Sequence, residues 1–136
     1  MKTKFLNCTL FTVTLLLTSC YSNEIYFDME KQSVVRCEDV IKQLYISSKD
    51  GKDCLCFTVS PGKKGSKVFS LKELNTNYTI DVLNSSVPLD FLHFKLRPET
   101  EYEIINHSNG DAAEGNLLIR TDKNGAVIYA NKTSCQ

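Results

Sequence analysis

Short runs of β-forming residues, spaced about ten residues apart, constrain the fold of this chain most strongly. These runs lie at 54–59, 67–71, 78–83 and 89–96, and further ones follow at 103–106, 117–120 and 126–129. The turn before the last run contains Asn124-Gly125, a dipeptide typical of tight hairpins. Short strands at such a spacing are typical of a sandwich or a barrel. We therefore predict a mainly β chain that folds as a single β-sandwich.

One segment has a different period. Apolar side chains recur there at the spacing of one helix face, namely Cys37, Val40, Ile41, Leu44 and Tyr45. Glu38 and Asp39 would lie in the first turn, where the helix dipole favours acidic side chains. The pattern predicts one short helix near 38–45. A strand remains open for 43–48, because that stretch also contains β-forming residues.

A corner motif supports the sandwich. Leu96, Pro98, Thr100 and Tyr102 fall in the order Leu-x-Pro-x-Thr-x-Tyr. These positions resemble the corner of fibronectin type III and related immunoglobulin-like sandwiches. In those domains the tyrosine hydroxyl bonds to backbone a few residues upstream and fixes the turn between two sheets. The resemblance implies the same role for Tyr102 and makes an immunoglobulin-like arrangement one form that the predicted sandwich can take.

The first twenty residues have the features of a secretory leader. Lys2 and Lys4 precede an apolar run at 5–17. At 1.5 Å per residue this run is too short to span a hydrocarbon core of about 30 Å. A leader of this kind is removed from the mature protein. We predict a signal peptide at 1–19.

The leader ends in Leu17-Thr18-Ser19-Cys20, which resembles the bacterial lipobox. The resemblance implies that the Cys20 thiol receives a diacylglyceryl group and becomes the new N-terminus. Further acylation, for example by palmitate, would make the anchor stable, because each buried methylene contributes about 0.8 kcal/mol. The predicted organisation is a lipid anchor and tether at 20–32, where an edge strand is the alternative, followed by a disulfide-stapled β-sandwich domain at 33–136.

A eukaryotic secreted glycoprotein is the alternative if the lipobox is fortuitous. Cleavage after Cys20 or Ser22 would then produce the mature chain. Five Asn-x-Ser/Thr sequences favour this interpretation, at Asn7, Asn77, Asn84, Asn106 and Asn131. However, Asn7 lies inside the leader, and a chain rich in Asn, Ser and Thr produces such sequences by chance.

Four cysteines remain beyond the leader and the lipobox: Cys37, Cys54, Cys56 and Cys135. An even number in an oxidising compartment predicts two disulfides. Cys54 and Cys56 would point to the same face of a strand about 6.6 Å apart, where a bridge would be strained. We expect each of them to pair with Cys37 or Cys135, in either combination. Zinc fits poorly, because its sites use two to four residues between paired cysteines.

The composition favours no other chemistry. Removal of Lys2 and Lys4 with the leader takes the formal charge from zero to −2. The sequence has no basic patch with interleaved aromatic residues, so we do not expect it to bind nucleic acid. The two histidines, His93 and His107, have no partner at metal-ligand spacing, and no catalytic triad or phosphate loop is apparent. We predict no enzyme activity, no cofactor and no metal.

The layout also is similar to that of small periplasmic lipoproteins that act as immunity proteins against type VI secretion effectors. The shared features are the size, the lipobox and a cysteine-containing strand before a Pro/Thr/Tyr corner, and they transfer no site residues. They imply a membrane-anchored, non-catalytic module that binds a protein partner. A structural or accessory outer-membrane lipoprotein is the alternative. Tyr21 follows Cys20 where Asp commonly signals inner-membrane retention in enterobacteria, which favours the outer membrane of a bacterial cell envelope.

Overall fold

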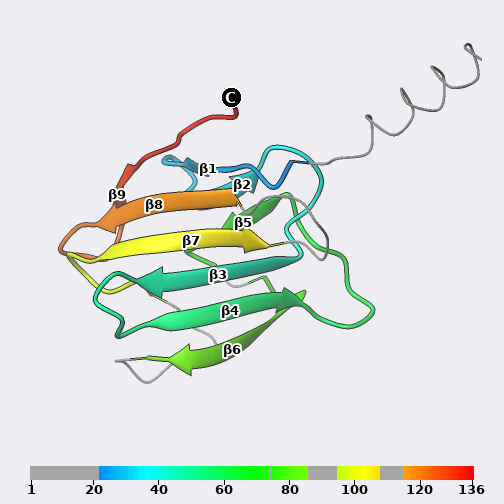
Figure 1. The fold of residues 1–136 in the computed structure, drawn as a ribbon, viewed down its shortest axis with the longest axis horizontal. Helices are drawn as coiled ribbons and strands as arrows, with labels where there is room; N and C mark the ends of the chain where they lie inside the picture. Colours follow the sequence, from blue (N-terminus) through cyan, green and yellow to red (C-terminus); the bar gives the residue numbers. More distant parts are fainter. Residues whose placement is uncertain (1–21, 74, 86–94, 108–114) are drawn as a thin grey trace, which may run out of the picture.

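The computed structural model describes residues 22–73, 75–85, 95–107 and 115–136. Within these ranges nine strands form two antiparallel sheets (Figure 1). The smaller sheet has the order β1–β2–β5, with β1 at Ile25–Asp28, β2 at Ser33–Arg36 and β5 at Val68–Ser70. The larger sheet has the order β6–β4–β3–β7–β8–β9. Its strands are β3 Gln43–Ser48, β4 Cys54–Val59, β6 Tyr78–Asn84, β7 Glu101–His107, β8 Gly115–Thr121 and β9 Val127–Ala130.

The central strands of the larger sheet show why these residues form a sandwich. Along β7, Tyr102, Ile104 and Asn106 are buried, whereas the residues between them are partly or fully exposed. β3 and β8 show the same alternation. Because successive side chains of a strand point to opposite faces, this pattern turns one face of the sheet toward the core and the other outward. The predicted β-sandwich is confirmed.

The core lies between the two sheets and joins them through aromatic contacts. Phe69 of β5 lies against Phe57 of β4 and Tyr78 of β6, with ring centroids 4.9 and 5.2 Å apart in edge-to-face geometry. Ile46, Ile104 and Leu117 of the larger sheet and Ile25, Phe27 and Val34 of the smaller sheet belong to the same buried cluster. Full burial of one such side chain contributes roughly 1.5–3 kcal/mol. The two sheets therefore share one core.

The predicted helix near 38–45 is wrong. Residues from Gln43 onward form β3, which pairs with β4 on one side and β7 on the other. Ile41 forms an isolated bridge with Ser66, and Asp39 takes a φ of 62°, which no α-helix accommodates. A helix would forfeit the hydrogen bonds to both neighbouring strands. The β-forming residues at 44–46 therefore decide the structure, and the helical spacing of the apolar side chains does not.

The predicted tether at 20–32 is also wrong from Ile25 onward. This segment supplies β1, in which Ile25 and Phe27 are fully buried. The C-terminal tail follows the free edge of β1, where the Phe27 N–H donates to the Lys132 carbonyl at 3.0 Å. Buried apolar side chains and paired backbone make this segment part of the domain. The edge-strand alternative is the one that the structure adopts.

In the smaller sheet β2 lies between β1 and β5, and in the larger sheet β7 lies between β3 and β8. β4 and β6 extend the second sheet beyond β3, and β9 extends it beyond β8. Tyr102 lies near the start of β7, and the corner motif likewise places its tyrosine near the start of a strand. Most of the strand predicted at 89–96 lies outside the described residues.

Candidate functional site

The sandwich has two ends, which we name by their contents. Strands β3 and β8 run from one end to the other, and β4 and β7 return. The corner end contains the β3–β4 turn, residues 96–102 and the β8–β9 turn. The anchor end contains Ser22, the 37–42 segment, the 60–67 loop and His107. In Figure 1 the anchor end lies at the right, where β4 and β7 finish.

At the corner end the four motif residues come together. The Tyr102 hydroxyl accepts a hydrogen bond from the Arg97 N–H at 2.8 Å, which is the upstream backbone contact that the motif implies. The same hydroxyl donates to Asp53 Oδ2 at 3.2 Å. The Thr100 hydroxyl donates to the Pro98 carbonyl at 2.8 Å, and Leu96 is buried. These contacts fix a turn, so the motif is structural.

Arg97 connects this turn to the β3–β4 turn. Its Nε donates to Asp53 Oδ2 at 2.6 Å, and its Nη2 lies 2.8 Å from both carboxylate oxygens of Asp50. Hydrogen bonds from Arg97, and then from Ser48 and the Lys52 N–H, hold the pKa of Asp50 well below its ordinary value of 3.8. Burial is the main reason that the pKa of Tyr102 rises to about 12, and the neighbouring Asp53 carboxylate adds to it. These hydrogen bonds hold the 96–102 turn against the β3–β4 turn.

The cysteines pair differently from the prediction. Cys37 and Cys135 form a disulfide with a Cα–Cα distance of 5.7 Å, whereas Cys54 and Cys56 are free thiols. Cys54 and Cys56 lie on β4, on the face opposite the buried Leu55 and Phe57, and therefore point away from the smaller sheet. Cys37 directly follows β2 of that smaller sheet, and the bridge joins it to the C-terminal tail. The expectation of two disulfides through β4 is therefore wrong.

At the anchor end three buried polar side chains hold the segment before β1. We call Asn23, Arg36 and Asn106 the clasp. Arg36 Nη2 donates to Asn23 Oδ1 at 2.8 Å and to the Ser22 carbonyl at 3.3 Å. Asn106 Nδ2 donates to the Asn23 carbonyl at 2.9 Å. All three side chains are at most 3% exposed, so the chain is fixed to the domain from Ser22 onward.

The sequence prediction did not include the clasp. Its only signal is that a charged residue, Arg36, directly follows Val34 and Val35 in a short β-forming run. Such a position indicates a buried side chain with polar partners, because an unpaired charge is costly inside a protein. The partners Asn23 and Asn106 lie on distant segments, and only the fold brings them together.

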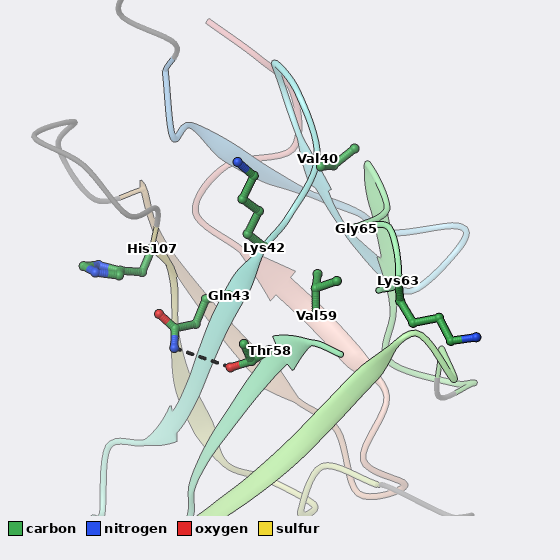
Figure 2. Close-up of a pocket in the computed structure, with 8 residues that line it drawn as sticks. All are labelled: Val40, Lys42, Gln43, Thr58, Val59, Lys63, Gly65 and His107. Atoms are coloured by element: carbon green, nitrogen blue, oxygen red, sulfur yellow. Dashed lines mark hydrogen bonds between the residues drawn. The ribbon is translucent and has the colours of Figure 1, made fainter. Parts of the chain in front are cut away.

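A shallow hollow of about 350 Å³ opens beside the clasp at the anchor end (Figure 2). Its wall includes Gln43 and Thr58, joined by a hydrogen bond of 3.4 Å, together with Val59 and His107. Lys42 and Lys63 lie on its rim, and Figure 2 shows that their side chains point away from one another. The two ammonium groups therefore do not converge on a single small anion. Instead they spread positive charge over this end.

The exposed apolar side chains lie mainly at the two edges of the larger sheet. On β6 they are Val82 and Leu83, and on β9 they are Ile128 and Tyr129. The Tyr129 ring lies under the Arg120 guanidinium, 5.5 Å from its centroid, which orients this aromatic side chain. Apolar groups gathered at strand edges are typical of surfaces that bind other chains.

Metal ligands, membrane-spanning helices and similarity to known proteins remain to be considered for this chain. Among the described residues no group of three or more His, Cys, Asp or Glu side chains is placed to hold a metal ion. The described residues contain no helix that is long and apolar enough to cross a bilayer. Cys20 and His93 lie outside the described residues. No family model, curated protein or solved structure matches the chain.

Proposed function

We propose that this chain is a bacterial envelope lipoprotein, anchored through acylated Cys20, whose sandwich is a non-catalytic module for binding a protein partner. The observation that carries the proposal is the sequence Leu17-Thr18-Ser19-Cys20 at the end of an apolar leader. The fold is compatible with this position, because Ser22, two residues after Cys20, is hydrogen-bonded to the domain.

The protein-binding role rests on the surface of the larger sheet. Leu83 and Ile128 are 65% and 56% exposed and lie on its two edge strands. A partner that covers either edge would bury apolar area and would also pair with unpaired backbone groups of an edge strand. Immunity to a secreted toxin is the specific form of binding that we propose, on the basis of the overall layout.

Metabolic labelling with a clickable fatty acid tests the anchor. The intact chain should incorporate the label and be recovered in the membrane fraction. Cys20→Ala should abolish the incorporation. Cys8→Ala is the matched control, because Cys8 lies in the leader and should leave the labelling unchanged. A mature protein that begins at Asn23 and carries glycans but no acyl chain would contradict the proposal and favour a eukaryotic secreted glycoprotein.

Affinity purification from solubilised membranes tests the binding role. Recovery of one tightly bound soluble protein, toxic to cells that lack this chain, would support immunity. Recovery of outer-membrane assembly machinery would contradict immunity and favour an accessory role. Leu83→Asp and Ile128→Asp are made separately, and the variant that no longer recovers the partner shows which edge of the larger sheet the partner covers. Lys123→Ala, at an exposed position, is the control and should recover the partner as before.

A further inference from the structure

The clasp places the domain close to the proposed lipid. Both backbone polar groups of Ser22 are hydrogen-bonded. Its N–H donates to Glu38 Oε2 at 3.0 Å, and its carbonyl accepts from the Arg36 guanidinium. Asn23 is buried at 3% exposure. Only Tyr21 lies between Ser22 and Cys20. Two residue steps span at most about 7 Å, so the domain can lie only that far from the acylated cysteine.

The acidic side chains at the anchor end are already engaged. Glu38 accepts from the Ser22 N–H, Asp39 lies 3.9 Å from the Arg36 guanidinium, and Glu24 accepts from the Gln136 N–H at 3.1 Å. Lys42 and Lys63, in contrast, form no ion pair with the described residues. The 60–67 loop adds Lys64, which is exposed. Glu24 and Glu38 keep their charges, because their donors are uncharged backbone N–H groups, but this end still presents three exposed lysines that form no ion pair with a carboxylate of the described residues.

We propose that the anchor end lies directly on the phospholipid headgroup layer, with Lys42, Lys63 and Lys64 facing anionic headgroups. The inference rests on the proposed acylation of Cys20. Each lysine near an anionic surface adds attraction, and lysines that diverge suit an extended charged plane better than a single phosphate. The sandwich is then held in one orientation and does not swing on a tether.

This orientation determines which surface reaches a partner. β3 runs from the anchor end to the corner end and the antiparallel β7 returns, and strands of this length extend about 20 Å. The β3–β4 turn and the β8–β9 turn would therefore point away from the bilayer. A partner would meet the corner end and the two sheet edges, while the hollow beside His107 would face lipid.

Hydrogen exchange on the acylated chain tests the orientation. The protein is reconstituted into vesicles of phosphatidylcholine mixed with phosphatidylglycerol and compared with Cys20→Ala in solution. Amides of the 37–42 segment and the 60–67 loop should exchange several-fold more slowly on vesicles, whereas those of the 49–53 and 122–126 turns should not change. Equal exchange at both ends, or slowing at the corner end alone, would overturn the proposal.

Two variants separate charge from anchoring. Lys42→Ala combined with Lys63→Ala should reduce the slowing on mixed vesicles, while Lys72→Ala combined with Lys123→Ala, with the same charge change elsewhere, should not. A flexible Gly-Ser insertion between Tyr21 and Ser22 should also reduce it, because the domain could then leave the surface. If Cys20 carries the fatty-acid label but the anchor end is not slowed, the orientation fails while the proposed lipoprotein stands. If the label is absent, the proposed function itself fails.

Discussion

Tyr102 serves the corner in two ways, because its hydroxyl accepts from the Arg97 N–H and donates to Asp53. Tyr102→Phe keeps the buried ring, removes the acceptor of the Arg97 N–H and leaves Asp53 Oδ2 with its bond from Arg97 Nε. Loss of such a buried hydrogen bond costs about 1–3 kcal/mol. We expect the free energy of unfolding, measured by urea denaturation of the non-acylated Cys20→Ala chain, to fall by this amount. Tyr129→Phe is the control, since Tyr129 is 48% exposed and should change stability little; an equal loss in both variants would contradict the assignment.

Asp50 should make the corner sensitive to acid. Its pKa in the folded protein lies below the ordinary value of 3.8, chiefly because Arg97 donates to it. A depressed pKa adds stability that is fully present above the unfolded pKa and is lost as the pH falls through the folded pKa. Stability should therefore decline below about pH 4. Asp50→Asn should flatten this part of the pH profile of the unfolding midpoint, and an unchanged profile would show that other carboxylates cause the decline.

At the scale of the elements, the disulfide is the covalent link between the segment after β2 and the C-terminal tail. It joins Cys37 and Cys135 across 98 residues, and a loop of that length contributes about 4–5 kcal/mol in the loop-entropy model. Cys37→Ser combined with Cys135→Ser should lower the free energy of unfolding by up to that amount. Thiol titration of the denatured, unreduced mature chain should count two free thiols, from Cys54 and Cys56. A count of zero would contradict the assignment of Cys54 and Cys56 as free thiols.

Gly115 sets the contact between β8 and the clasp. A Cβ built on this residue would lie 1.9 Å from the Asn23 carbonyl oxygen, which is itself bonded by Asn106. Gly115→Ala must therefore push the segment before β1 away from the sheet, and overpacking of this kind costs about 1–3 kcal/mol. Proteolysis should then cleave near Ser22 more readily. Asn116→Ala, at the neighbouring exposed position, is the control and should leave the cleavage rate unchanged.

Local sequence predicted the elements that local forces decide. The alternation of apolar residues in β8 and the Asn124-Gly125 turn depend on neighbouring residues, so these elements could be predicted. β3 could not be separated from a helix, because Leu44 fits both periods, and only pairing with β4 and β7 decides between them. The disulfide pairing and the clasp depend on contacts between distant segments such as Asn23 and Asn106. Sequence spacing contains no information about those contacts.

For the molecule as a whole, one shared core predicts one cooperative unfolding transition. The Phe57, Phe69 and Tyr78 rings join the two sheets, and Ile25 of β1 belongs to the same buried cluster as Ile104 of β7. The smaller sheet cannot separate without exposing these side chains, and single domains of this size usually unfold as one unit. Val34 lies on the central strand of the smaller sheet, and Ile104 lies on an interior strand of the larger sheet. Hydrogen exchange measured at increasing urea concentration should therefore give the same opening free energy for these two amides. A lower value at Val34 would show that the smaller sheet opens independently, and the clasp would then anchor a mobile element instead of a rigid domain.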